Sequence, residues 1–542
     1  MPAAARALLV LIVLATLGTT VLASAPTQWP DGWSREKRIV DGVVHYGHAS
    51  APAGRDGLWL ATVNYRAGQT VIDVTLYSLS AQAIVAGTAL PVTHLLRGFT
   101  VQATTEGLAV VWLEREEGVQ STLHKATLNM TGGLVEQKIV WRTAALAEAP
   151  AVAQDADGTM YVAFSAAIDG HHAIHLLTLG SDGEAPILRR LTTPDELASA
   201  PTIAVAGGRM HLVFHGHRQQ YAWAQYHLYE LPTLNLLQSS TLSRVPQDYE
   251  HPPTLLANPD GSVTVVWQRM WVTNARVFPM EPTQGRLHNG NWVEPLTVLL
   301  PLRGRVSTAR GARGEDGRIL VVAMVEVGRM WQAQSILRDG AGNTVRAGFA
   351  TMARGSALSA RPVLVGNTGV VTFFSHDGAG RPQIYLVQTA TPARRTFAFR
   401  IGLDPHSPIG DALYRYVSFL TGALFLAFGA TGAMVISLFT VWLMSRLSLF
   451  STATLGSYLR IAVLFGIIIL LKQPDSLLYF GAVMLPGVAA LVSWAGAAAL
   501  ALATIHLAEL PTDDYLTLSF AGFLFVLGDT FTSLFIAGVG RW

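Results

Sequence analysis

Seven positions at the ends of predicted strands carry the side chains best placed to bind a ligand. Each lies seven residues after a recurring glycine and directly follows an apolar strand. The seven are Asn64, Glu114, Ser165, His215, Gln268, Met324 and His376. The loops that follow add charged and aromatic residues, among them Tyr65, Arg66, Arg115, Arg269, Trp271, Asp377 and Arg381. Arginine and aromatic groups suit an anionic or carbohydrate-like ligand, or an acidic protein surface. The alternative is that these loops are polar only because they are solvated.

Histidines in two of these loops have the right chemistry for a metal ion. His171 and His172 follow one apolar strand, and His215 and His217 follow the equivalent strand of the next unit. Two imidazoles from neighbouring loops, with an oxygen from Asp169, would be ligands of the kind that zinc prefers. Solvated loop histidines are the more common arrangement, so the sequence predicts no metal and no other cofactor.

A repeat places these residues relative to one another. The stretch Asp155–Phe164 joins an Asp-Gly turn to an alternating apolar strand that ends in an aromatic residue. Comparable turns place glycine at 57, 107, 158, 208, 261, 317 and 369, at intervals of 50 to 56 residues. A period near 50 with several short strands per unit is typical of a β-propeller. The sequence therefore predicts an all-β, seven-bladed propeller over 38–402, in which equivalent polar residues gather on one rim.

Prolines mark where many first strands begin, and the sequence leaves two ways for the ring to close. The first strand of a unit often opens with proline, which costs no ladder hydrogen bond there. A final fourth strand is expected at 396–401, after a third strand at 383–387. The ring closes either end to end or through an N-terminal strand around 39–46 that completes the last blade.

The unit resembles that of the bacterial sialidase-like propellers, also called Asp-box or BNR proteins. The resemblance covers about 38–402 and rests on proline-opened strands, Asp-x-x-Gly turns and aromatic strand ends. The segment 155–159 comes nearest to the Asp box Ser-x-Asp-x-Gly-x-Thr-Trp, which no unit matches in full. The expected turn also joins the first and second strands, rather than the third and fourth.

The resemblance implies a glycoside hydrolase with a tyrosine–glutamate nucleophile pair and an arginine triad. Tyr249 and Glu250 are the adjacent pair that could match it. The arginines available for a triad are Arg66, Arg115, Arg269 and Arg381. The residues alone do not fix the mutual geometry of these groups.

Composition excludes several function classes. The chain has 542 residues, a formal net charge of +2 and no cysteine. The absence of cysteine rules out disulfides, a catalytic thiol and thiolate metal sites. Lys and Arg are scattered rather than clustered, so nucleic acid is not an expected partner.

The two ends of the chain predict export and membrane insertion. Residues 1–25 resemble a signal peptide, with Arg6 before an apolar stretch and small residues at 23–25, or else an uncleaved anchor. Residues 26–37 form an entry segment, and 403–411 a linker. Within 412–542, four apolar stretches, at about 417–444, 453–471, 477–507 and 515–539, are long enough to span a bilayer. The sequence thus predicts an integral protein of the plasma (inner) membrane, with the propeller outside the cytoplasm.

Asp529 falls near the middle of the fourth stretch, where a charge is costly. Either it locks helix packing through hydrogen bonds, or it couples protons or signals. The leading hypothesis is a multi-pass membrane protein whose propeller binds ligands or protein partners as part of a membrane complex. The alternatives are a membrane-tethered sialidase-like hydrolase and a transport or assembly accessory centred on Asp529.

Overall fold

A computed structural model describes most of the propeller and four helices that follow it. It covers residues 32–390, and then 413, 417, 431–446, 454–471, 487–507 and 514–539. The gaps within 32–390 are 44–46, 117–119, 146, 149, 169, 181–184, 194–196, 219–220, 246–252, 270–271, 274–275, 278–280, 300–305, 328–329, 352–355 and 377–379. The chain divides into two compact units, Gln28–Ala393 and the combined segments Met1–Thr27 and Arg394–Trp542. The predicted signal segment and linker lie outside the described residues.

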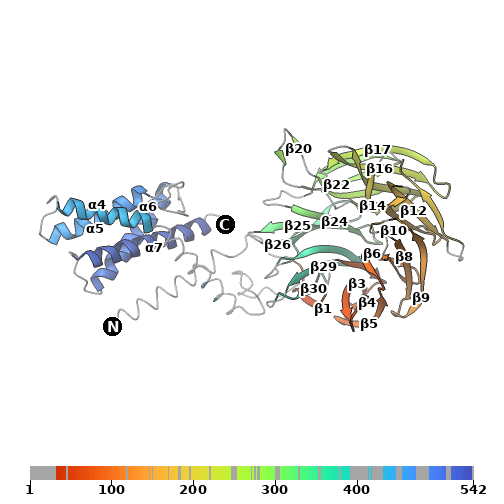
Figure 1. Cartoon of the computed structure of the whole chain (residues 1–542), viewed down its shortest axis with the longest axis horizontal. Helices are drawn as coiled ribbons and strands as arrows, with labels where there is room; N and C mark the ends of the chain where they lie inside the picture. The colour runs from red at the N-terminus through yellow and green to blue at the C-terminus, as the bar shows by residue number, and fades with distance from the viewer. Residues whose placement is uncertain are drawn as a thin grey trace. The chain divides into compact units, whose positions relative to one another are not determined.

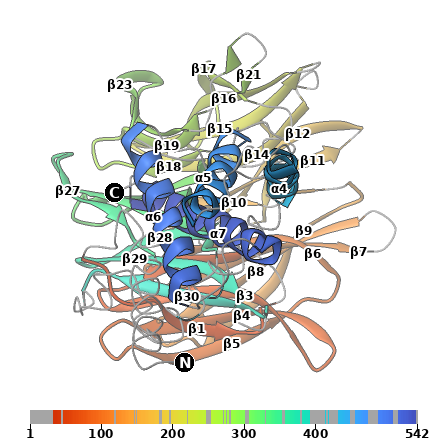
Figure 2. The same ribbon diagram turned by 90° about the vertical axis from the view of Figure 1, so that its left-hand side faces the viewer.

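The first unit is a seven-bladed β-propeller, as predicted. Its described strands form seven four-stranded antiparallel sheets and one two-stranded ribbon. The first strands of neighbouring sheets lie against one another in the closed order β2, β6, β10, β14, β18, β24, β28 and back to β2. These strands therefore surround the propeller axis, as in other propellers. In Figure 2 the chain colour runs round this ring from red through yellow and green to teal.

The strand bounds follow the repeat closely. Blade 1 is β2 (His48–Ala53), β3 (Gly57–Arg66), β4 (Gln69–Ser78) and β5 (Ala83–Pro91). Blade 2 is β6 (Leu95–Thr104), β7 (Gly107–Glu116), β8 (Gln120–Asn129) and β9 (Leu134–Thr143). Blade 3 is β10 (Ala151–Gln154), β11 (Met160–Ile168), β12 (His171–Leu179) and β13 (Ile187–Arg190). Blade 4 is β14 (Leu197–Ala206), β15 (Arg209–Arg218), β16 (Tyr221–Glu230) and β17 (Leu236–Val245).

The remaining blades depart slightly from this plan. Blade 5 is β18 (Thr254–Ala257), β19 (Val263–Arg269), β22 (Glu281–His288) and β23 (Asn291–Val298), with the ribbon β20 (Val272–Thr273) and β21 (Arg276–Val277) inserted. Blade 6 is β24 (Val306–Arg313), β25 (Ile319–Val327), β26 (Met330–Arg338) and β27 (Thr344–Phe349). Blade 7 is β28 (Leu358–Val365), β29 (Thr368–His376), β30 (Pro382–Gln388) and, from the N-terminus, β1 (Lys37–Asp41).

The N-terminal strand closes the ring. β1 pairs antiparallel with β30, with Lys37 opposite Leu386 and Asp41 opposite Gln383 (Figure 1). The outermost place in blade 7, expected at 396–401, is thus occupied by a strand from the other end of the propeller. Residues 396–401 themselves lie outside the described part of the chain. Pairing across almost the whole propeller leaves no local mark in the sequence, which is why both modes of closure stayed open.

The turn of the repeat is held by its own aspartate. In blade 3, Asp155 Oδ1 accepts hydrogen bonds from the backbone N–H groups of Asp157 (3.0 Å) and Thr159 (2.9 Å). The hydroxyl of Tyr161 donates to Oδ2 at 3.0 Å. Gly158 has φ +85°, a conformation that glycine adopts without the strain a side chain would cause. The segment nearest to an Asp box is therefore a structural turn between first and second strands.

The core is divided among the interfaces between blades. Trp59 of blade 1 and Trp112 of blade 2 share one fully buried cluster. Phe164 belongs to the cluster between blades 2 and 3, and Phe214 to that between blades 3 and 4. The aromatic residues of the second strands thus pack one blade against the next. Burying a large side chain of this kind contributes about 1.5–3 kcal/mol, so the ring is held by repeated contacts of similar size.

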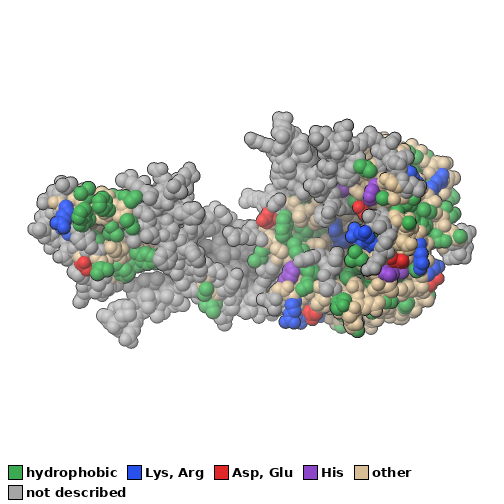
Figure 3. Space-filling model, in the orientation of Figure 1, with side chains coloured by type: hydrophobic (Ala, Val, Ile, Leu, Met, Phe, Trp, Pro, Cys, Tyr) green, Lys and Arg blue, Asp and Glu red, His purple; other side chains and the backbone are tan. Residues whose placement is uncertain are grey.

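The second unit contains four described helices, α4 (Thr431–Arg446), α5 (Thr454–Leu471), α6 (Gly487–Leu507) and α7 (Tyr515–Val539). Their buried side chains form one cluster, in which the rings of Phe465 and Phe525 stack at 4.2 Å. The Cα of Ala497 would lie 3.1 Å from a Cβ on Gly528, so α6 and α7 approach closely at small residues. Other apolar side chains of this unit are exposed, among them Phe439 and Leu516. Figure 3 shows hydrophobic side chains on the surface of this unit.

The predicted membrane domain is overturned. Over the part of the chain that the structure describes, no helix is both long enough and apolar enough to cross a membrane. An apolar run alone does not distinguish a bilayer span from a helix in a protein core, and here many of these side chains pack against neighbouring helices. The predictions of a four-span domain and of an integral plasma-membrane protein are therefore corrected.

Candidate functional site

The predicted rim positions do lie at equivalent ends of the second strands, but most are buried. Asn64, Glu114, Ser165, His215, Gln268 and Met324 are all buried, and only His376 is exposed. The chain enters each blade at this same end, so a polar side chain here meets the incoming segment. Its first role is to bond that segment or a neighbouring strand.

In blade 1 the rim holds a buried carboxylate between two donors. Asn64 Nδ2 donates to Asp73 Oδ2 at 2.5 Å, and Arg66 Nη2 lies 2.8 Å from the same oxygen. The Asp73 side chain is buried, whereas that of Arg66 is 62% exposed. Asp73 comes from β4, directly across from β3, so local strand pairing brings the three together.

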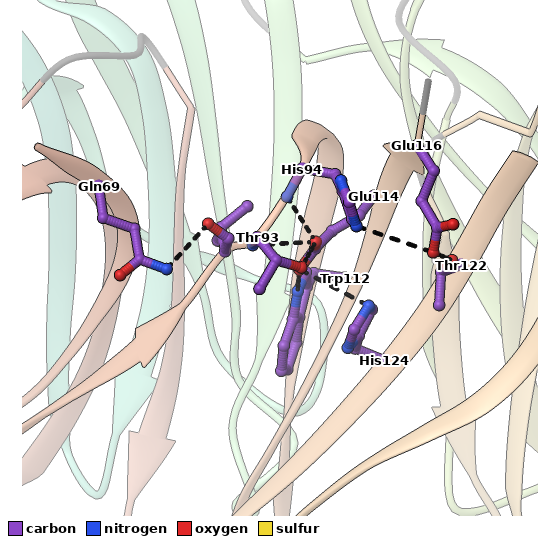
Figure 4. Close-up of polar contacts among 9 residues, drawn as sticks. Gln69, Thr93, His94, Trp112, Glu114, Glu116, Thr122 and His124 are labelled. Carbon is purple, nitrogen blue, oxygen red and sulfur yellow. Dashed lines mark hydrogen bonds and ion pairs between the residues drawn. The ribbon is translucent and has the colours of Figure 1, made fainter. Parts of the chain in front are cut away.

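In blade 2 the carboxylate of Glu114 has no exposed surface and accepts four hydrogen bonds (Figure 4). Its Oε2 accepts from the backbone N–H of Thr93 (3.0 Å), the Thr93 hydroxyl (2.7 Å) and the backbone N–H of His94 (2.9 Å). Its Oε1 accepts from Trp112 Nε1 at 2.8 Å. Thr93 and His94 belong to the segment that links β5 to β6, so Glu114 ties this link to the blade it enters.

Two histidines flank this carboxylate, and the sequence pattern did not single out either. His124 Nε2 lies 3.6 Å from Glu114 Oε1, too far for a hydrogen bond, and its ring stacks on Trp112 at 4.9 Å. Burial lowers the pKa of His124, although Glu114 acts in the opposite direction. His94 Nε2 lies 3.9 Å from Glu116 Oε1, which accepts a hydrogen bond from the Thr122 hydroxyl at 2.8 Å. Histidine recurs in the third strands of blades 2, 3 and 4, as His124, His175 and His227, and this was the available signal.

Two other rim residues form hydrogen bonds with the next blade. Gln268 Nε2 donates to the carbonyl oxygen of Ser307, and its Oε1 accepts from the N–H of Ala309 at 2.6 Å. Ser165 Oγ donates to the carbonyl oxygen of Ala198 at 2.8 Å. These residues fasten blade 5 to blade 6 and blade 3 to blade 4.

What the described rim exposes is mainly cationic and aromatic. Tyr65 is 63% exposed beside Arg66 in blade 1, and His376 and Arg381 are exposed at the same end of blade 7. β2 and β28 lie against each other, so these two blades are neighbours. We call Tyr65, Arg66, His376 and Arg381 the cationic rim. Arg115, predicted to belong to this face, is only partly exposed in β7.

The predicted metal ligands are only partly described. His172, partly buried in β12, lies opposite Ala167, and His215, buried in β15, lies opposite Ser199. Asp169 and the side chains of His171 and His217 lie outside the described residues. Among side chains that are described, no group of three or more His, Asp and Glu residues is arranged to hold a metal ion.

Other predicted site residues also fall in gaps. Tyr249, Glu250, Trp271 and Asp377 lie outside the described residues, as does the side chain of Arg269. The nucleophile pair of the hydrolase hypothesis therefore stays a prediction.

In the helical unit, Asp529 of α7 is buried, and its Oδ1 accepts a hydrogen bond from Ser493 Oγ of α6 at 2.8 Å. The same hydroxyl lies 3.2 Å from the Asp529 carbonyl oxygen. Asp529 thus joins two packed helices, and the correction of the membrane domain removes the basis for an intramembrane role.

Three basic side chains near the axis were not predicted. His48 lies in β2, Arg310 in β24 and Arg361 in β28, the innermost strands of blades 1, 6 and 7. Burial lowers the pKa of Arg310 to about 10, and burial together with the charge of Arg310 lowers that of Arg361. Burial, with repulsion from both arginines, lowers the pKa of His48 to about 3. The three groups therefore lie close enough to act on one another.

Comparison with known proteins gives no family. No family model matches the chain, and no curated protein matches its sequence. Among solved structures, the chain is similar to an ulvan lyase bound to -[GlcA(1-4)Rha3S]-, with TM-score 0.42 and 11% identity over 68% of this chain and 100% of the other. The polysaccharide lyase Uly1 gives TM-score 0.39 and 10% identity over 64% and 91% of the two chains. Hydrazine synthase of Kuenenia stuttgartiensis gives 0.41 and 12% over 64% and 96%. Similarities this weak carry no inference about activity.

Proposed function

We propose that this protein is a non-catalytic propeller that binds an anionic ligand on its cationic rim. The observation that carries the proposal is that the acidic and the basic groups of this face differ in exposure. The carboxylates of Asp73 and Glu114 are hydrogen-bonded inside the fold, whereas the side chains of the cationic rim are exposed.

The engaged carboxylates are poor candidates for acid–base chemistry. Glu114 is inaccessible and saturated by four donors, and Asp73 is buried between Asn64 and Arg66. A general acid or base must reach the proton that it transfers, directly or through one water molecule. Neither carboxylate meets this condition without breaking the bonds that hold the rim.

The exposed groups favour binding instead. Arg66 already bonds one carboxylate, yet most of its side chain is accessible, so part of its planar fork can meet a second acceptor. Tyr65 beside it offers an apolar ring with a polar tip, a combination that is common where proteins bind ligands. An acceptor-rich anion, such as an acidic carbohydrate, would meet donors from two adjacent blades.

Binding of dextran sulfate and of uncharged dextran of equal length to the full chain tests the proposal. We expect dextran sulfate alone to bind, with an affinity that falls as salt rises. Arg381→Gln and Arg66→Gln should each weaken binding several-fold, because an exposed charge pair contributes roughly 1 kcal/mol or less. Arg189→Gln, which removes an exposed arginine from the outermost strand β13, is the matched control. Equal binding of both polymers, or equal loss in the control, would contradict the proposal.

The sialidase-like hydrolase is kept as a separate prediction. Release of a fluorogenic sugar by the full chain, abolished by Glu250→Gln, would establish it and displace the non-catalytic proposal. Binding to an acidic protein partner is a further outcome that the rim variants would detect through the same loss of affinity.

A further inference from the structure

Three side chains near the propeller axis each have one buried nitrogen without a hydrogen-bond partner among the described residues. Nη1 of Arg310, Nε of Arg361 and Nδ1 of His48 are inaccessible to solvent, and none has a hydrogen-bond partner among the described residues. Both arginines are partly buried overall, as expected for side chains that line an axis rather than fill a core. Arginine stays protonated in proteins, so the two guanidinium groups keep both their charge and their N–H donors.

No carboxylate among the described residues acts on these charges. Among described groups, the charges that act on His48 are Arg361 and Arg310, and the charge that acts on Arg361 is Arg310. Two like charges held together inside a protein, without a counterion, destabilise the fold. Buried charges are normally paired, and each unmade hydrogen bond of a buried donor costs about 1–3 kcal/mol. An arrangement of this kind is explained if a bound anion completes it.

The chemistry of the three groups defines that anion. His48 is neutral at pH 7, and its Nε2 lies 3.0 Å from the Thr372 hydroxyl. If the Thr372 hydroxyl donates to Nε2 rather than to Ser50 Oγ, which lies 3.4 Å away, Nδ1 carries the proton and is a third donor. The site then has two positive charges and donors from three directions, which match a doubly charged tetrahedral oxyanion better than a monoanion.

We propose that a dianionic phosphate or sulfate group binds near the axis between Arg310 and Arg361, with His48 as a third donor. The site uses no residue of the cationic rim. The proposal therefore goes beyond the function proposed above, and its test is independent of that function. His48 and Arg310 pair with Thr62 and Val322, two residues before the rim positions Asn64 and Met324 in their strands. Arg361 pairs with Thr372, four residues before the rim position His376. At about 3.3 Å per residue, the anion would lie roughly 7–13 Å below the rim.

The test is thermal unfolding and calorimetry of the full chain in sodium sulfate against sodium chloride at matched ionic strength. We expect a saturable stabilisation by sulfate that chloride does not give. Arg310→Gln and Arg361→Gln should each lower the affinity about ten- to a hundredfold, the loss expected for one charge-assisted hydrogen bond. Arg318→Gln is the matched control, because that guanidinium is already bonded to Asp316 and to Asn367.

A second readout separates anion binding from a purely structural role. Without sulfate or phosphate, Arg310→Gln and Arg361→Gln should be at least as stable as the unchanged protein, because each removes an uncompensated charge. If the arginines only support the fold, both variants will be less stable and sulfate will act on them as on the unchanged protein. Absence of any saturable sulfate effect on the unchanged protein overturns the proposal.

Two further arms keep the proposal testable if a variant does not fold. In the unchanged protein, bound sulfate should raise the pKa of His48 measured by NMR, and no rise would refute the site. Inorganic phosphate and glucose 6-phosphate, compared at pH 8, distinguish a free ion from a group carried on a larger ligand. Binding of the sugar phosphate indicates a ligand that enters from the rim, and binding of the free ion alone indicates an ion held within the ring.

Discussion

Replacing Glu114 by glutamine should destabilise the propeller far more than the loss of one charge on a surface would. The carboxylate accepts four hydrogen bonds, three at Oε2 and one at Oε1. Glutamine keeps one oxygen and turns the other into an N–H donor. If its oxygen takes the place of Oε2, its amide N–H groups face Trp112 Nε1, and that fully buried donor loses its acceptor.

The magnitude follows from which donors can find water. Thr93 and His94 are exposed residues, so water can replace part of what their N–H groups lose. Trp112 has no such access, and a stranded buried donor costs about 1–3 kcal/mol. Weakening the three bonds at Oε2 from charged to neutral adds about 1 kcal/mol or more. We therefore expect the free energy of unfolding to fall by about 2–4 kcal/mol.

Urea unfolding of the full chain, followed by tryptophan fluorescence, measures this difference. Glu116→Gln is the matched control, because that carboxylate is partly exposed and accepts one hydrogen bond, from Thr122. The control should lose no more than about 1 kcal/mol. A Glu114→Gln variant within about 0.5 kcal/mol of the unchanged protein would refute the view that this carboxylate fastens blade 2 to its incoming segment.

Two further predictions concern buried histidines and the contact between blades 5 and 6. The pKa values of His48 and His211 fall to about 3 and about 4 on burial, below the ordinary 6.5, so the unfolded chain binds more protons between those values. In chloride buffer, the free energy of unfolding should therefore be constant above pH 6.5. It should fall by about 1.4 kcal/mol per pH unit for each histidine as pH drops towards 4. If His211→Gln leaves the dependence of this free energy on pH unchanged, the prediction is wrong. Gly311→Ala should cost about 1–3 kcal/mol in urea unfolding, because its Cβ would lie 2.9 Å from Val266 Cγ2 across the blade interface. Gly87→Ala is the matched control, because its Cβ would meet only ordinary contacts at 3.8 Å within a strand. A loss in Gly311→Ala no larger than that in Gly87→Ala would show that packing at Gly311 is loose.

The repeat made the blades predictable because its signals are local. An Asp-Gly turn and the alternating strand after it lie within ten residues, and both are set by backbone geometry that few residue types satisfy. Closure by β1 depends on pairing Lys37 with Leu386, which no local pattern records. For the helices, apolar composition predicted their positions but not their surroundings. The same composition suits a bilayer span and a helix packed in a protein core.

Position within the repeat predicted the rim but not its bonding. The seventh residue after each repeat glycine does mark one end of the propeller, yet whether Glu114 meets a ligand or Thr93 depends on the path of the preceding segment. The repeat did not predict Arg310 and Arg361 for a related reason, because it marks residues at strand ends and both arginines lie inside first strands. The sequence around these arginines does distinguish them. Each follows an alanine and precedes glycine or proline, so its neighbours in the chain are small and none is acidic. A charged residue inside an innermost strand needs an opposite charge, either from another blade across the axis or from a bound ligand. No described carboxylate acts on Arg310 or Arg361. Interior charges of first strands are therefore the residues to compare first when only the repeat of a propeller is known.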